Sequence, residues 1–130
     1  MSHVGCLSCL ACTNLLFRPL TERPGRIGNW DYFNTDGLGL LEFLEWCEDM
    51  DMEAVLAVYA GYSISLSVYA PGQSYPPDAM PGVLQEALDM LEYVTGNTST
   101  YWGAKRAQHG HPEPFTLKSV SPVSIWKTLS

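Results

Sequence analysis

Basic residues are scarce in this sequence, because seven Lys and Arg stand against 14 Asp and Glu, for a net charge of −7. A chain with this excess of negative charge is not expected to bind a nucleic-acid backbone or an anionic membrane surface. The sequence also lacks a run of about 20 apolar residues, so we expect no transmembrane helix. No Lys or Arg precedes Arg18, so we expect no signal peptide of the kind that begins with a basic segment.

Cysteine is rare as well, with four residues, of which Cys6, Cys9 and Cys12 form a CxxCxxC pattern. This spacing can ligate zinc or an iron–sulfur cluster. The spacers here are Leu-Ser and Leu-Ala, and a complete site needs a fourth ligand, so we expect neither a metal nor another cofactor. We instead expect residues 1–17 to be an unstructured or misassigned N-terminal segment.

The rest of the sequence has the composition of one folded domain, with 46% apolar and 12% aromatic residues. Residues 36–49 have helical periodicity, with Thr35 or Asp36 as N-cap. Residues 78–94 have it too, with Asp78 as N-cap. The first helix is predicted to bury Leu40, Leu41, Leu44 and Cys47. The second is predicted to bury Val83, Leu84, Ala87, Leu88 and Leu91.

Residues 54–60, AVLAVYA, form a continuous apolar run, which predicts a strand buried on both faces. The other predicted elements are strands at 30–34, 62–70 and 115–120, a short helical turn at 99–106, and loops at 18–29 and 71–78. Alternating strands and helices predict an α/β fold with a parallel sheet. Two architectures fit this order, a doubly wound open sheet or two to three βα units of a (β/α)₈ barrel.

Several side chains could carry chemistry, and each also has a structural interpretation. Asp36 and Glu42 could form an acid/base pair, but they fit a helix cap and a helix surface better. The acidic run EFLEWCEDMDME is best interpreted as a solvated helix face. His109 and His111 could bind a metal as a pair, but they fit a structured loop before a strand. Asn97-Thr98-Ser99 is an N-glycosylation sequon, which has meaning only in a secreted chain.

Two longer stretches carry a family resemblance. Residues 19–61 contain RPGR, a Trp and TDGLGLLEFLEWCEDM, and residues 84–118 contain EYVTG, WGAKRA and GHPEPF before Leu117-Lys118. Together they resemble the catalytic domain of family 51 α-L-arabinofuranosidases, particularly fungal ones, over about 100 of the 130 residues. The resemblance implies a partial (β/α)₈ barrel. It also implies retaining hydrolysis of terminal α-L-arabinofuranosyl residues from arabinoxylan and related polysaccharides, by two carboxyl groups.

The resemblance fails where the catalytic residues should follow. After GHPEPF the family continues into a strand that ends Gly-Asn-Glu, where the Asn contacts the sugar and the Glu is the acid/base. Counting without a gap, Ser124 stands at the Asn position and Ile125 at the Glu position. Pro122 is expected to interrupt a central strand. The nucleophilic Glu is expected beyond Ser130, so we predict no catalytic residue in this chain.

The resemblance therefore divides the sequence into an unmatched segment 1–17, a barrel fragment 18–118 and an unmatched tail 119–130. In a barrel, Tyr59 and Gly61 would end a strand at the active-site face, which makes them the candidate substrate-binding residues. The family also implies an extracellular location and an arabinose-containing polysaccharide or oligosaccharide as ligand.

Two functions follow as hypotheses. The first is a truncated and catalytically incomplete arabinofuranosidase, whose exposed strand edges would limit its independent stability. The second is a small acidic α/β binding protein without enzymatic activity, which would have to fold cooperatively on its own.

Overall fold

The computed structural model describes residues 2–5, 20–27, 33–59, 62–63, 73–74 and 76–123. The elements follow one another as β1 (Ser2–Gly5), the 3-10 helix η1 (Leu20–Glu22), β2 (Arg26–Ile27), β3 (Phe33–Asn34), α2 (Leu40–Asp49), β4 (Ala54–Tyr59), β5 (Tyr62–Ser63), β6 (Gln73–Ser74), α3 (Met80–Thr95), α4 (Tyr101–Gln108) and β7 (Leu117–Val123). The alternation of strands and helices confirms the predicted mixed α/β class.

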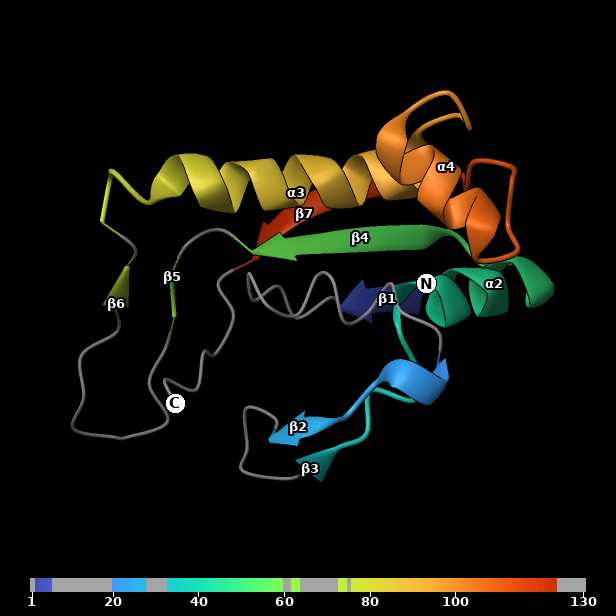
Figure 1. Cartoon of the computed structure of the whole chain (residues 1–130), viewed down its shortest axis with the longest axis horizontal. Helices are drawn as coiled ribbons and strands as arrows, with labels where there is room; N and C mark the ends of the chain where they lie inside the picture. Colours follow the sequence, from blue (N-terminus) through green and yellow to red (C-terminus); the bar gives the residue numbers. More distant parts are fainter. Residues whose placement is uncertain are drawn as a thin grey trace.

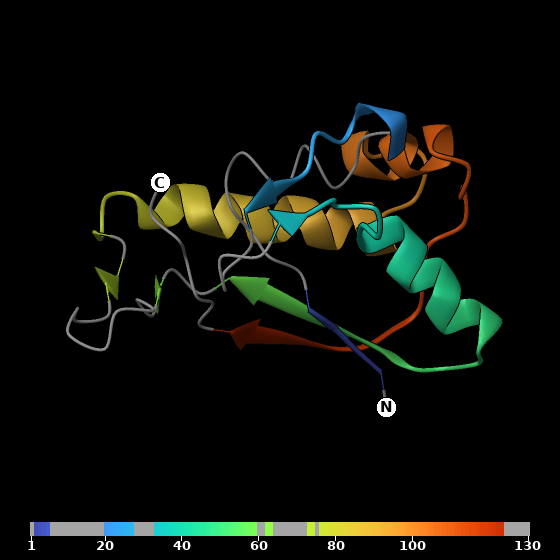
Figure 2. The same ribbon diagram turned by 90° about the horizontal axis from the view of Figure 1, so that it is seen from below.

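The main sheet contains three parallel strands in the spatial order β1-β4-β7, which is also their order along the chain (Figure 1). Helices α2, α3 and α4 all lie on the same side of these strands (Figure 2). The strand β1 corrects the expectation of an unstructured N-terminal segment for Ser2 to Gly5, which pair with Ala54 to Ala57. Cys6, Cys9 and Cys12 lie outside the described residues.

The central strand β4 is buried on one face only. Ala54, Leu56 and Val58 are buried in the core, whereas Val55 and Ala57, which point to the other face, are half-exposed. The prediction of a strand buried on both faces was therefore wrong for the described part of the chain. The reason is that the described helices cover a single face of the sheet, so the second face has no layer against it.

Helix α2 buries the four residues that its periodicity predicted, Leu40, Leu41, Leu44 and Cys47. It begins four residues later than predicted, because Asp36 has a φ of 52°, in the left-handed region that a right-handed helix cannot contain. The N-cap is Gly39, and the prediction of Thr35 or Asp36 was wrong.

Helix α3 buries only part of the predicted stripe, because Val83 is buried and Ala87 packs against the core, but the leucines of the stripe are not buried. Its buried residues are Val83, Met90, Tyr93 and Val94, whereas Leu84 and Leu88 are 59% and 48% exposed. The N-cap is Ala79, which makes no side-chain bond, so the prediction of Asp78 was wrong. The helix is apolar over more than one face, and the sheet selects which face becomes the core.

The smaller elements follow the predictions in part. The expected strand at 30–34 is described as β3, which pairs antiparallel with β2, and residues 64–70 of the expected strand 62–70 lie outside the described residues. The loop expected at 71–78 contains β6, which pairs with β5. The helical turn expected at 99–106 is confirmed as α4, whose N-cap Thr100 accepts a hydrogen bond from the Gly103 N–H at 3.2 Å.

Strand β7 continues through Pro122, which corrects the expectation that this residue would interrupt the strand. Pro122 pairs with Val58, and Val123 pairs with Tyr59. In the described sheet β7 is an edge strand with β4 as its one neighbour. A proline is tolerated on an edge strand, because its missing N–H then faces away from the ladder.

Candidate functional site

The carboxyl ends of β4 and β7 are the place where the sequence predicts substrate contact. Tyr59 is the last residue of β4 and is paired with Val123, the last residue of β7. Both strands therefore end at the same edge of the sheet. Gly61, Ser124 and Ile125 lie outside the described residues. Substrate binding by Tyr59 and Gly61 stays a prediction.

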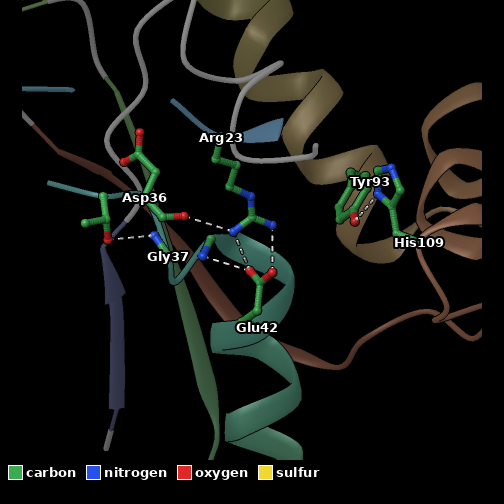
Figure 3. A network of polar contacts seen from close by, with 8 residues as sticks. Arg23, Asp36, Gly37, Glu42, Tyr93 and His109 are labelled. Carbon is green, nitrogen blue, oxygen red and sulfur yellow. Dashed lines mark hydrogen bonds and ion pairs between the residues drawn. The ribbon is translucent and has the colours of Figure 1, made fainter. Parts of the chain in front are cut away.

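A polar network lies at the start of α2, around Arg23 (Figure 3). The Arg23 side chain is 3% exposed, and its Nη2 donates to Oε1 of Glu42 at 2.6 Å, while Nη1 donates to Oε2 at 3.2 Å. Nη1 also donates to the backbone oxygen of Asp36 at 3.0 Å. The guanidinium thus joins the segment before β2 to the loop that leads into α2.

The same network decides the role of Glu42. Burial raises the pKa of its carboxyl group, but hydrogen bonds from Arg23 and from the Gly39 backbone outweigh burial and lower the pKa below its usual value. The Gly39 N–H donates to Oε2 of Glu42 at 2.7 Å, which completes a helix cap. A carboxylate that is held ionised in this way cannot serve as a general acid near neutral pH.

The proposed pair of Asp36 and Glu42 is therefore structural, as the sequence favoured. Asp36 is buried at 1% exposure, and it contributes its backbone oxygen to Arg23. The rest of the acidic run divides along α2. Glu45 is half-buried, whereas Glu48 and Asp49 are exposed at the end of the helix.

A second polar pair joins α3 to the residue that follows α4. The Tyr93 hydroxyl, in a side chain that is fully buried, lies 3.0 Å from Nδ1 of His109 (Figure 3). Burial lowers the pKa of His109, and the cations of Lys105 and Arg23 act in the same direction. Burial also raises the pKa of Tyr93, with the carboxylate of Glu42 adding to the effect. Both shifts favour the uncharged forms, so a neutral hydroxyl and a neutral imidazole share this hydrogen bond.

His109 and His111 do not form a metal pair. His111 stacks on Phe115 with ring centroids 3.9 Å apart, and its Nε2 lies 3.0 Å from Oε2 of Glu48. Its Nδ1 lies 2.7 Å from the backbone oxygen of Glu113. The two histidines thus contact different partners. No three His, Cys, Asp or Glu side chains among the described residues are grouped so that they could hold a metal ion.

The side chain that organises this region was missed by the sequence analysis. Arg106 of α4 is completely buried, and its five hydrogen bonds all go to backbone oxygens. Three of these oxygens belong to the end of α3 and two to the loop before β7, namely those of Tyr93, Val94, Gly96, His111 and Pro112. An arginine in a polar helix such as YWGAKRAQ gives no signal of burial, because its partners are backbone groups that any sequence supplies.

These contacts stabilise the junction of α3, α4 and β7 at the amino ends of the strands. The Phe115 N–H also donates to the Val94 oxygen at 2.9 Å, so the loop before β7 is attached directly to the end of α3. The network lies away from the end of the sheet where β4 and β7 terminate (Figure 1). None of the helices among the described residues is long and apolar enough to cross a membrane.

Comparison with known proteins places this arrangement in a family. Residues 14–122 match the model of the α-L-arabinofuranosidase 1 domain. The chain is 45% identical over 102 residues to a probable α-L-arabinofuranosidase A of Aspergillus terreus and 44% identical over 101 residues to the α-L-arabinofuranosidase A of Aspergillus niger. Each match covers 78% of this chain and 16% of the relative.

Solved structures agree with these relatives. An arabinose-bound family 51 α-L-arabinofuranosidase matches 82% of this chain with a TM-score of 0.73 and 44% identity, and the match covers 16% of that protein. The α-L-arabinofuranosidase of Thermotoga maritima, in complex with arabinose, matches 91% of this chain with a TM-score of 0.63 and 25% identity, over 22% of its own length. The chain therefore belongs to the family 51 α-L-arabinofuranosidases and corresponds to a small part of such an enzyme.

Proposed function

We propose that this chain is a segment of the (β/α)₈ catalytic barrel of a family 51 α-L-arabinofuranosidase. The support comes from the order of its strands, because β1, β4 and β7 are neighbours in space in the order in which they follow along the chain. Helices on a single side of the strands also support a barrel, since doubly wound sheets carry helices on both faces.

Membership of the family supports a role in hemicellulose degradation. The parent activity that we propose is retaining hydrolysis of terminal α-L-arabinofuranosyl residues from arabinoxylan or arabinan, with an arabinose-containing polysaccharide or oligosaccharide as the ligand. Two related structures hold arabinose, which supports this ligand class. Because such polymers are plant-wall components, we propose that the parent enzyme acts outside the cell.

We further propose that these 130 residues do not hydrolyse arabinosides by themselves. One observation carries this proposal. The pairing of Tyr59 with Val123 brings both strands to one edge, which is where barrel enzymes place their catalytic groups. The two residues after Val123 are Ser124 and Ile125, and an isoleucine can neither donate a proton to the leaving group nor accept one from water.

The test is an assay of the purified chain with an aryl α-L-arabinofuranoside, beside the Aspergillus niger enzyme as a positive control. We expect release of the aryl group at the rate of the buffer blank. Turnover above the blank that survives repeated purification would overturn the proposal of an incomplete enzyme. A calorimetric titration with arabino-oligosaccharides separates the second hypothesis, because saturable binding without turnover would favour a non-enzymatic binding protein.

A further inference from the structure

The loop between α3 and α4 contains the Asn97-Thr98-Ser99 sequon, and all three residues are exposed. The Ser99 hydroxyl and the Ser99 N–H both donate to Oδ1 of Asn97, the second at 2.9 Å. Nδ2 of Asn97 donates no hydrogen bond to any of the described residues. The amide nitrogen therefore faces solvent, while the amide oxygen is held by the hydroxyl residue of its own sequon.

The backbone beneath this side chain is closely packed. The Asn97 oxygen accepts hydrogen bonds from the N–H and the hydroxyl of Thr100, at 3.1 and 3.0 Å. A Cβ atom at Gly103 would lie 2.0 Å from the Asn97 oxygen, so α4 can approach this turn closely only because it has glycine there. The backbone of Asn97 thus faces the protein on one side and presents the side chain on the other.

The loop between α3 and α4 lies far from the carboxyl ends of the strands, so a bulky group on it would not cover them. Helix α3 runs opposite to β4, so its end at Thr95 lies beside the start of the strands (Figure 1). Six residues of β4 separate that end from the edge at Tyr59, which corresponds to about 20 Å. A group on Asn97 would therefore lie at the end of the sheet opposite to the edge where the strands terminate.

We propose that Asn97 is an N-glycosylation site, whose glycan projects from the amino ends of the strands. The co-substrate is a lipid-linked oligosaccharide diphosphate. The bond between the sugar C1 and the diphosphate oxygen breaks, and a bond forms between C1 and Nδ2 of Asn97. The amide gives up one proton, and the lipid diphosphate leaves with the bonding electron pair. No oxidant or reductant is required.

The inference rests on one part of the proposed function, the location of the parent enzyme outside the cell. N-glycosylation occurs on chains that enter the secretory pathway. It adds a modified residue and a location on the surface that the enzymatic proposal does not contain. It also implies that the glycan leaves the edge at Tyr59 and Val123 open. A glycan at that edge would obstruct a polymeric substrate, whereas one at Asn97 would not.

The experiment expresses the full chain behind a cleavable secretion signal in yeast and analyses the peptide that contains Asn97 by mass spectrometry. Treatment with peptide-N-glycosidase converts a glycosylated Asn97 to Asp, and we expect this conversion in most of the secreted chain. Ser99→Ala and Thr98→Pro should abolish it, because both destroy the sequon. The matched variant Thr98→Ala alters the same turn but keeps the sequon, so it should be modified like the parent chain.

Translation in vitro with microsomes provides a second readout, because glycosylation there does not require a stable fold or export. An unmodified Asn97 in the translocated chain would overturn the inference, and so would modification that persists in Ser99→Ala. The arabinoside assay is independent of both outcomes. A glycosylated chain that hydrolyses arabinosides would remove the proposal of an incomplete enzyme but leave the glycosylation site intact.

Discussion

The two ends of the parallel strands differ in the side chains that they carry. At the amino ends, Arg106, Tyr93 and His109 join α3, α4 and the loop before β7 through buried and partly buried hydrogen bonds. At the carboxyl ends, the last pair of Tyr59 and Val123 is followed by Ser124 and Ile125, which bring no carboxyl group. In barrel enzymes the amino end serves stability and the carboxyl end serves catalysis. If the segment is part of a barrel, as we propose, it has the stabilising contacts of the amino end and lacks a carboxyl group at these two positions after Val123.

The largest effect is expected from Arg106, the centre of the amino-end network. Arg106→Ala removes five hydrogen bonds to backbone oxygens, of which the Val94 oxygen keeps its bond from the Phe115 N–H, and it opens a cavity. We therefore expect it to lower the free energy of unfolding by about 3–5 kcal/mol. Arg106→Lys should recover only part of this, because a lysine cannot offer the planar set of donors. The measurement is urea unfolding followed by circular dichroism.

Lys105→Ala is the matched control for this change, because Lys105 precedes Arg106 on the same helix but is partly exposed. It should change stability by less than about 0.5 kcal/mol. Equal effects of the two alanine variants would show that the buried network does not hold the junction together.

Leucine truncation compares the core with the exposed face of α3. Leu44 is 1% exposed and Leu84 is 59% exposed, and both lie in helices, so the helix propensity term is the same. We expect Leu44→Ala to cost about 2–5 kcal/mol and Leu84→Ala less than about 0.5 kcal/mol, as measured by urea unfolding. A large loss from Leu84→Ala would mean that the apolar stripe predicted from the sequence is buried after all.

A smaller effect is expected at the start of α2. Glu42→Gln keeps the size of the side chain but removes the charge that faces Arg23, so we expect a loss of about 1–3 kcal/mol at pH 7. The pKa of Glu42 is lowered in the folded state, so its contribution is present above pH 4.5 and disappears as the pH falls. Glu45→Gln, on the same helix, is the control. In parallel thermal melts at pH 7 and below pH 4.5 it should leave the stability almost unchanged.

The smallest effect is a pH dependence at His109. Burial lowers the pKa of His109 in the folded state, so the unfolded chain takes up the proton first, near pH 6.5. Stability is therefore full above this pH and falls as the pH drops through the folded value. We expect the parent chain to lose more stability than His109→Asn between pH 7.5 and 5.5. Asparagine keeps a side chain that can hydrogen-bond to the Tyr93 hydroxyl but cannot titrate. Equal losses would contradict a role for His109.

Much of the fold could be predicted from local patterns. The periodicity of residues 40–47 identified the buried face of α2, because four apolar residues share one side of this helix and its four carboxylates lie outside that stripe. Helix α3 has apolar residues around more than one face, so periodicity could not decide between Leu84 and Met90. The burial of Arg106 was also beyond prediction, because its partners are backbone oxygens that become close only when α3, α4 and the loop before β7 meet.

The sequence by itself determined the family, the alternation of strands and helices, and the serine and isoleucine at the positions of the expected catalytic pattern. All three features depend on residue identity and on patterns between residues close in the sequence, which can be read without the structure. The tertiary structure decided that β7 runs through Pro122 and that the described helices cover β4 on one face. It also decided that Asp36 and Glu42 both accept hydrogen bonds from Arg23. Each of these depends on which elements become neighbours. Burial and hydrogen bonding between elements that are distant in the sequence select those neighbours, and these contacts form only as the chain folds.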